Sequence, residues 1–528
     1  MGSNCTSVSA TRIGSNSVGD GRRNALVFPL PRLLVGDPSR HPVRSLLIGA
    51  GGVVAPGRRS SPLVHMQDPF ELLATASFGE AGQGVTRQTV GTMPAPPPPG
   101  ATRPTVDPPP PLAVGFGLPW DRWIPDPVAH LGAARDRHGD TFIVDSGMDR
   151  YLFVFSPAGV RSFYGLPEER ASKGVGDWRM LSRKLPPEIF DGRRTLPHEL
   201  FGRDDVRRYL DQLDYAIDLQ IAELGEQGEF ELFSFARRLG HRLGLASWAG
   251  RRSAEGCRFD SLIAALDVLD GSSAFVYPGD MAAVAAADMA DERAALVAAE
   301  ELIAQTLREG VDTADELLTE IVGRWEGERQ ATVGIARDVV LIHLASMSNL
   351  FAALGWTVAH LLLHTAVADR LRAGEPGLAE RCALESTRLA QRSIMLRYVL
   401  RPVDIDDGVA VRTVSQGATI ATLLPLLNTS SAPGLTSYDP DRWAGRHLRD
   451  EAALASRELV TSFGHGRHTC PAQPFSLAAI GRTATRLFAE FELSPRFTSI
   501  APLPGQIGGV ARASAPCPVH YRVRPAIP

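Results

Sequence analysis

A long and almost unbroken apolar segment in the second half of the chain constrains the fold more than any other feature. The segment, TVGIARDVVLIHLASMSNLFAALGWTVAHLLLH (332–364), is too long and too apolar for a helix that lies on a protein surface. It also contains the polar residues His343 and Asn349, which favour a buried helix over a membrane span. The sequence therefore predicts a large domain built around one central helix.

The patterns on either side of this segment are mostly helical. Long amphipathic or apolar helical patterns fill 200–395, for example DDVRRYLDQLDYAIDLQIAEL and MAAVAAADMADERAALVAAEELIAQTL. Short strand patterns precede them (DTFIVDSG, RYLFVFS), follow them (YVLRPVDI, GVAVRTV, ATIATLL) and end the chain (VHYRVRP). We expect a mainly α fold with small β-sheets, in a single large domain that covers 113–528.

The N-terminal 1–112 differ from the rest because they show no sustained helical or strand periodicity. They end in MPAPPPPGATRPTVDPPPP, a composition that favours extended, polyproline-like chain. We interpret 1–112 as a disordered Pro/Gly-rich extension.

Composition excludes several classes of function. A net charge of -4 gives no reason to expect nucleic acid or an anionic membrane as a partner. The five cysteines are widely spaced without a CxxC pair, which argues against a disulfide framework or a zinc cluster and fits a reducing compartment. No signal-peptide pattern or transmembrane segment is evident, so we expect a cytoplasmic protein. Lysine occurs only at Lys173 and Lys184, which we interpret as compositional bias.

The stretch TSFGHGRHTCPAQPFS (461–476) places Cys470 after a glycine-rich, cationic loop and directly before a helical pattern. A thiolate is the metal-binding form of cysteine, and backbone N–H groups, positive charge and a helix N-terminus all stabilise it. Gly464 and Gly466 allow a tight turn, while Arg467 and His468 add cations or donors. The pattern predicts a ligating thiolate, and the alternative is a small buried cysteine in a turn.

This loop resembles the haem-binding signature of the cytochrome P-450 family. That signature is a phenylalanine, two variable residues, a glycine, a basic residue and a cysteine, here Phe463, Gly466, His468 and Cys470. Ala472 stands where the family usually has glycine, and arginine is more usual than histidine at 468. Both changes are compatible with the geometry.

Other motifs of the family follow in the expected order. ESTR resembles the ExxR motif, with Glu385 and Arg388 on one face of a helix. YDPDRW resembles the motif whose arginine, here Arg442, completes that pair, and Arg397 lies where the family often has an arginine for a haem propionate. The resemblance covers about 113–528 and implies a structural role for the Glu385 pair; a solvated helix salt bridge is the alternative.

The resemblance implies haem b as cofactor, with Cys470 as the metal ligand. The residues that it implies for cofactor binding are Cys470, His468, Arg397, Phe463, Gly464 and Gly466, with His468 and Arg397 on the propionates. A further cation would come from DGRRTLPHELFGR, in which Arg193, Arg194 and His198 are unranked candidates.

The central helix departs from the family where an acid and an alcohol usually deliver protons. In ASMSNLFAALGW these positions are Ser348 and Asn349, our catalytic candidates, and neither side chain is an acid at neutral pH. The stretch resembles sterol 7α-hydroxylases, and equally prostacyclin synthases, which rearrange an endoperoxide without external electrons. LGEQGEFELFSFARRLGHRLG is similar to bacterial sterol 14α-demethylases. Alternatively, Asn349 bonds a backbone carbonyl.

These resemblances imply a soluble bacterial haem-thiolate monooxygenase acting on a hydrophobic sterol, terpene or fatty-acyl-like substrate. Segments expected to line its pocket, such as NLFAAL and PLPGQIGGVARAS, are mostly apolar with few fixed charges. The chain shows no flavin or iron–sulfur motif, so a ferredoxin or flavoprotein would supply electrons. The alternatives are a haem-dependent isomerase or dehydratase acting on a peroxide, and a non-catalytic haem-binding protein.

Overall fold

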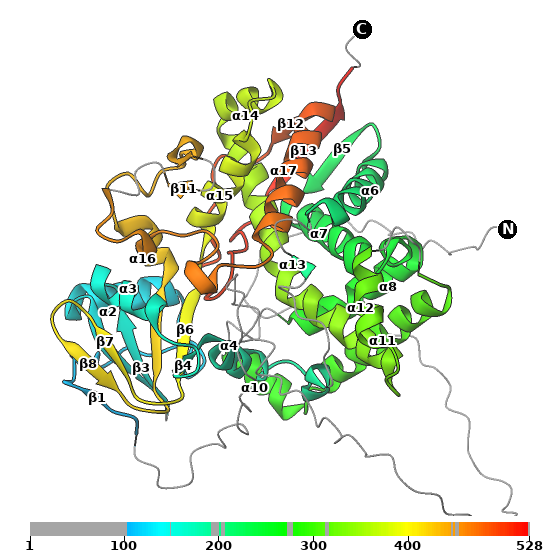
Figure 1. The fold of residues 1–528 in the computed structure, drawn as a ribbon. Helices are drawn as coiled ribbons and strands as arrows, with labels where there is room; N and C mark the ends of the chain where they lie inside the picture. Colours follow the sequence, from blue (N-terminus) through cyan, green and yellow to red (C-terminus); the bar gives the residue numbers. More distant parts are fainter. Residues whose placement is uncertain are drawn as a thin grey trace, which may run out of the picture. The chain divides into compact units, whose positions relative to one another are not determined.

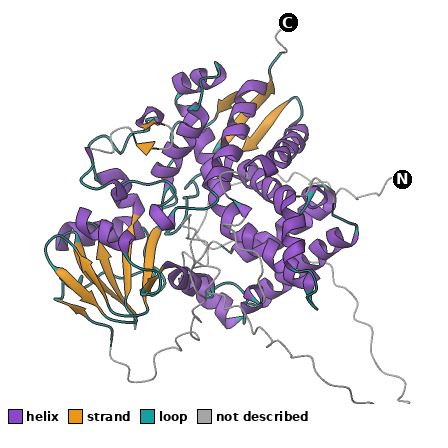
Figure 2. Ribbon diagram, viewed as in Figure 1, coloured by secondary structure: helices purple, strands orange, loops and turns teal. Residues whose placement is uncertain are grey.

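The computed structural model describes residues 103–147, 149–191, 200–201, 206–271, 278–311, 316–444, 447–448 and 453–525. The candidates Arg193, Arg194 and His198, and residues 1–102 of the predicted extension, lie outside this part. Within it the chain is mainly helical with small sheets, which confirms the predicted fold class (Figures 1 and 2).

The predicted central helix is α13 (Ala331–Leu363), a helix of 33 residues. By length and composition it could cross a membrane, but 72% of its most apolar stretch is buried inside the structure. It packs against α7, α11, α15 and α17, which surround it in Figure 1. α13 is therefore the core helix that its apolar sequence predicts.

A group of helices packs on one side of α13 and buries a large apolar cluster with it. Glu231 caps the start of α7 by accepting hydrogen bonds from the N–H groups of Phe233 and Ser234. The group consists of α6 (Val206–Leu224), α7 (Leu232–Trp248), α8 (Gly256–Asp270), α11 (Ala290–Arg308) and α12 (Glu316–Arg324).

Two further helices, α15 (Leu378–Ala390) and α17 (Gln473–Glu490), pack against α13 and against each other. α15 carries the ExxR motif, and α17 follows the Cys470 loop. Their packing therefore positions both motifs beside the central helix. The other helices are α2 (Pro127–His138), α3 (Pro157–Gly165), α4 (Lys173–Leu181), α10 (Pro278–Ala286), α14 (Thr365–Arg372) and α16 (Leu424–Ser430), with short 3-10 helices such as η1 (Pro187–Phe190), η4 (Pro440–Arg442) and η7 (Gly466–His468).

The strands form small sheets at the margins of the helices. The largest has the order β2-β3-β9-β6-β4 and packs over a second apolar cluster, in which Phe142, Phe153 and Phe155 stack. Its strands are β2 (Thr141–Ser146), β3 (Asp149–Val154), β9 (Thr419–Leu423), β6 (Ile394–Val399) and β4 (Ala171–Ser172). The others are β1-β8-β7 (Val106–Asp107, Val411–Val414, Val403–Asp406), β12-β13-β5 (Phe491–Pro495, Pro518–Val523, Gln227–Glu231) and β10-β11 (Trp443–Ala444, His447–Leu448).

The predicted boundary after 112 lies inside the folded region. Val106 is buried and pairs with Val414 through β1 and β8, and the Arg103 guanidinium lies 2.6 Å from the Asp145 carboxylate. Leu112 forms a further bridge to β2. Although prolines follow it, β1 is an edge strand, and an edge strand needs hydrogen bonds on one side only. The folded region therefore includes 103–112, which we had assigned to the extension.

Candidate active site

The Cys470 loop is a closed turn whose shape depends on Gly464. The backbone N–H of Cys470 donates to the carbonyl of Phe463 at 2.7 Å, and Gly464 N–H donates to the Thr461 hydroxyl at 2.7 Å. Gly464 has φ +85°, and a Cβ there would lie 2.4 Å from the carbonyl oxygen of His468. Only glycine fits this position without strain. Gly466 also has positive φ, +57°, but nothing lies within 4 Å of its Cβ position.

The Cys470 sulfur lies at the start of α17, where backbone N–H groups face it. Burial raises the pKa of the Cys470 thiol, whereas hydrogen bonds from the N–H groups of Ala472 and Gln473, and the charge of Lys173, lower it. A bound cation reverses the effect of burial, because it stabilises the thiolate directly. The donors around Cys470 therefore fit a thiolate that ligates a metal.

Arg397 and His468 meet in the interior although 71 residues separate them. Arg397 is fully buried, and its guanidinium donates to the carbonyls of Leu166 and Ala171 at 2.9 and 2.8 Å and contacts the imidazole of His468. The Glu168 carboxylate lies 3.4 Å from the same guanidinium. These contacts hold the Arg397 side chain in place beside the Cys470 loop.

Two nitrogen atoms of this pair are buried without a hydrogen-bond partner, Nδ1 of His468 and Nε of Arg397. Burial, followed by the nearby cations of Arg397, Lys173 and Arg467, lowers the pKa of His468 to about 3. The neutral ring therefore accepts from Arg397 through Nε2 and has an N–H donor left at Nδ1. Unused donors in a cationic setting fit an anionic group such as a haem carboxylate.

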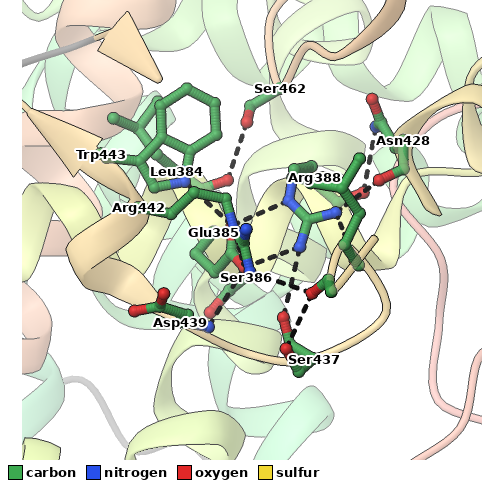
Figure 3. Close-up of polar contacts among 12 residues, drawn as sticks. Leu384, Glu385, Ser386, Arg388, Asn428, Ser437, Asp439, Arg442, Trp443 and Ser462 are labelled. Atoms are coloured by element: carbon green, nitrogen blue, oxygen red, sulfur yellow. Dashed lines mark hydrogen bonds and ion pairs between the residues drawn. The ribbon is translucent and has the colours of Figure 1, made fainter. Parts of the chain in front are cut away.

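Glu385, Arg388 and Arg442 come together as predicted, in a buried cluster (Figure 3). Arg388 donates from Nε and an η-nitrogen to the two carboxylate oxygens of Glu385 at 2.8 and 2.6 Å, and both side chains are fully buried. Arg442 Nε lies 3.4 Å from the same carboxylate, and Trp443 Nε1 donates to it at 2.9 Å. The pair is therefore not a solvated helix salt bridge.

Asn428 connects this cluster to the Cys470 loop, and sequence reasoning missed it. Arg388 donates to the backbone carbonyl of Asn428 at 2.5 Å, while the Asn428 amide donates to the carbonyl of Arg388 at 3.1 Å. The same amide donates to the carbonyl of Thr461 at 2.9 Å. No motif surrounds Asn428, so only its fully buried position reveals its role.

One face of α13 is open in the middle of an otherwise buried helix. Ala345 and Asn349 are exposed and Ser348 is half-buried, and the spacing of these residues puts them on one face. The side-chain oxygen of Asn349 accepts from the N–H of Val510 at 2.9 Å, and among the described residues no bond from its amide to a backbone carbonyl occurs. The two N–H donors of its amide make no hydrogen bond to the described residues and remain available on the open face.

Ser348 contacts an acid that sequence reasoning did not find. Its hydroxyl donates to the carboxylate of Asp270, the last residue of α8. Lys184, Arg237 and Arg512 surround this carboxylate at 3.9, 3.4 and 3.2 Å, so this region holds more fixed charge than we predicted. A signal for Lys184 was present in the sequence, since the chain has only this lysine and Lys173. Rarity of lysine alone does not reveal that Lys184 lies beside Asp270.

Comparisons with known proteins find similar sequences over parts of this chain. No protein-family model matches the chain. It is 24% identical over 213 residues to human 24-hydroxycholesterol 7-alpha-hydroxylase (Homo sapiens) and 26% over 208 residues to the Mus musculus enzyme, matches that cover 35% and 34% of this chain. The chain spans less than half of these relatives, 43% and 42% of their length. It is 25% identical over 422 residues to obtusifoliol 14-alpha demethylase of Triticum aestivum, covering 72% of this chain and 90% of the relative.

Solved structures show the same fold. The haem domain of cytochrome P450DA superposes with a TM-score of 0.61 at 18% identity, covering 76% of this chain and 94% of that domain. A triple mutant of the same domain gives 0.59 at 17% identity, covering 76% and 93%. The structure therefore has the fold of a cytochrome P450 haem domain. The cytochrome P-450 motifs in the sequence predicted this fold.

Proposed function

We propose that this protein is a haem b-dependent monooxygenase that inserts one oxygen atom of dioxygen into a hydrophobic, sterol-like substrate. The observation that carries the proposal is the Cys470 loop, in which the sulfur faces backbone N–H donors at the start of α17. The relatives support the reaction class, because their names describe a sterol hydroxylase and a demethylase.

The residues present fit a haem group at this loop. Cys470 would ligate the iron, while Arg397 and His468 would hold its carboxylates. A thiolate-ligated haem supplies the iron at which dioxygen is reduced and the O–O bond is broken. The chain's own contribution is to hold the sulfur in place through the turn at Gly464 and the hydrogen bond of the Cys470 N–H, and to orient hydrogen-bond donors on the open face of α13.

The open face of α13 supplies those distal groups. The oxygen of Asn349 is held by the Val510 N–H, which directs its amide N–H groups to the open face, where they can orient water by hydrogen bonding. The overall reaction consumes substrate, dioxygen, two protons and two electrons and yields hydroxylated product and one water. A separate ferredoxin or flavoprotein would deliver the electrons one at a time.

The first test is the absorption spectrum of the reduced, carbon monoxide-bound protein. We expect the red-shifted Soret band of a thiolate-ligated haem in the parent and its loss in Cys470→Ser. Cys517→Ser is the matched control, because Cys517 is also a free thiol but lies near the C-terminus, outside the site. A parent protein without this band would overturn the proposal.

Turnover assays then distinguish a monooxygenase from an isomerase and from a non-catalytic haem protein. Sterols such as 24-hydroxycholesterol and obtusifoliol are the probes, since the relatives are named for them. A monooxygenase consumes reductant and dioxygen in proportion to hydroxylated product. Product formed from an endoperoxide without reductant would favour the isomerase instead, and a thiolate spectrum with neither activity would favour a non-catalytic haem protein.

A further inference from the structure

We propose that Asp270, acting through Ser348, passes protons to the open face of α13, where Ser348 stands at the position usual for an acid. This inference rests on the proposed monooxygenase function, which consumes two protons in each turnover. Asp270 lies on α8 and Ser348 on α13, 78 residues apart, so an acid and an alcohol are brought together across two helices.

The carboxylate of Asp270 is buried and held from several elements. Its side chain is 11% exposed, and the Ser348 hydroxyl donates to one of its oxygens. Arg512 from the C-terminal loop and Arg237 from α7 donate to the other oxygen at 3.2 and 3.4 Å. These cations and the serine together lower the pKa of Asp270 against the effect of burial, so it is ionised at neutral pH.

Lys184 places an ammonium group beside this carboxylate. It lies between α4 and η1, is 7% exposed, donates to the backbone carbonyl of Asp270 and has its ammonium 3.9 Å from the carboxylate. Burial lowers the pKa of Lys184 to about 8, and Asp270 and Glu292 only partly offset that effect. An ammonium group of this kind exchanges its proton near neutral pH, unlike an ordinary surface lysine.

The cluster extends from solvent to the open face. At its outer end the side chains of Asp267 and Arg512 are 40% and 42% exposed. At its inner end Ser348 precedes the exposed Asn349. Arg237 bridges Asp267 and Asp270, so charged groups are continuous between the two ends.

A histidine pair completes the set of titratable groups packed around Asp267. His241 Nε2 lies 3.1 Å from the Asp267 carboxylate, and His241 Nδ1 lies 2.9 Å from Nε2 of His343 on α13. Burial lowers the pKa of both histidines, so they are neutral and do not add positive charge at neutral pH. The cations that face Asp270 in the described residues are therefore Lys184, Arg237 and Arg512.

The transfer conserves protons and charge. A water between Lys184 and Asp270 passes a proton to the carboxylate and takes one from the ammonium, since their 3.9 Å separation is too long for a direct hydrogen bond. The Ser348 hydroxyl, which donates to Asp270 at rest, turns toward the open face. Asp270 then passes its proton to the oxygen of Ser348 as the serine releases its own hydroxyl proton to a water oriented by Asn349. Asp270 returns to its ionised form, and solvent reprotonates Lys184. Each product molecule requires this sequence twice, with dioxygen as oxidant and the external redox protein as reductant.

Asp270→Asn and Ser348→Ala test the relay against Asp260→Asn, a change of the same kind on α8 at an aspartate whose side chain is 61% exposed. With dioxygen and reductant, we expect a rate loss of roughly 100-fold, the lower end for general acid catalysis, and a larger solvent deuterium isotope effect. With hydrogen peroxide, which brings its own protons, we expect the rate to stay within about twofold of the parent. Asp260→Asn should match the parent in both assays.

A spectroscopic readout does not depend on turnover. In the haem-free protein, the infrared carboxylate band that Asp270→Asn removes should shift in Ser348→Ala, because the hydrogen bond from the hydroxyl is lost. Ser348→Ala keeps every charge of the cluster, so it remains informative if Asp270→Asn does not fold.

The outcomes distinguish a failure of the relay from a failure of the monooxygenase proposal. Variants that match the parent with dioxygen overturn the relay alone, and equal losses with dioxygen and with peroxide overturn it by assigning Asp270 a structural role. A parent that shows no reductant-driven turnover on any probe sterol overturns the monooxygenase proposal first, and the relay with it.

Discussion

Asn428 and Thr461 exchange two hydrogen bonds, one in each direction. The N–H of Thr461 donates to the Asn428 side-chain oxygen at 2.9 Å, and the Asn428 amide donates to the Thr461 carbonyl at 2.9 Å. Because Asn428 also bonds the backbone of Arg388, one buried side chain joins the start of the Cys470 loop to the Glu385 cluster.

Asn428→Ala should loosen the Cys470 loop. It leaves the Thr461 N–H and two carbonyls without partners, and a buried unsatisfied group costs about 1–3 kcal/mol. We expect the free energy of unfolding to fall by about 3 kcal/mol and haem to transfer faster to an acceptor protein. Thr429→Ala is the control, because among the described residues the Thr429 hydroxyl bonds within its own helix, to the carbonyl of Pro425. Equal effects of the two changes would contradict the bridging role of Asn428.

Gly464→Ala and Gly466→Ala form a matched pair in the same loop. Both glycines have positive φ, which costs a non-glycine residue about 1 kcal/mol. Only at Gly464 does the new Cβ also meet the carbonyl of His468. We expect Gly464→Ala to retain little haem and Gly466→Ala to retain most of it, as measured by the haem-to-protein absorbance ratio. The reverse order would show that the loop has a different shape.

Glu385→Gln should strongly destabilise the fold. Removal of its charge leaves Arg388 buried without a counter-ion, and breaking a buried ion pair costs about 3–5 kcal/mol. Glu490→Gln is the control, since Glu490 pairs with Arg486 near the surface and such a pair contributes about 0.3–0.5 kcal/mol. Denaturant unfolding measures both values. A loss below about 1 kcal/mol for Glu385→Gln would mean that water reaches the pair.

Lys184 should make stability rise with pH in the alkaline range. Its pKa is lowered to about 8 in the folded protein and is near 10.5 when unfolded. Between these values the unfolded chain binds the extra proton, so the free energy of unfolding increases with pH, by up to ~1.4 kcal/mol per pH unit. We expect Lys184→Met to lack this rise between about pH 8 and 10, and Lys173→Met, which alters the only other lysine, to keep it. Urea titrations at several pH values measure the slopes, and a parallel rise in Lys184→Met would assign it to another group.

Chains that begin at residue 103 and at residue 113 should differ in stability. The shorter chain lacks β1, the buried Val106 and the ion pair of Arg103 with Asp145. Burial of one valine contributes about 1.5–3 kcal/mol, so we expect the shorter chain to be less stable by at least that amount in denaturant unfolding. Equal free energies of unfolding for the two chains would support the predicted boundary at 112.

Much of the fold, and of the site around the Cys470 loop and the Glu385 cluster, could be predicted from local sequence patterns. The apolar length of α13 predicted a core helix, and the three-residue spacing of Glu385 and Arg388 placed both on one helix face. The boundary at 112 failed because proline content indicates extended chain but does not reveal whether an edge strand lies within reach.

The sequence by itself determined the elements and the chemistry that neighbours along the chain share: the central helix, the glycine turn at Gly464 and the sulfur of Cys470. The tertiary structure alone decided which distant polar groups meet, such as Arg397 with His468 and Asp270 with Ser348. The backbone conformation of a segment and its apolar periodicity depend on residues that are close neighbours along the chain. Both can therefore be recognised in the sequence. A buried hydrogen bond between two helices depends on how those helices pack, and no local pattern encodes that.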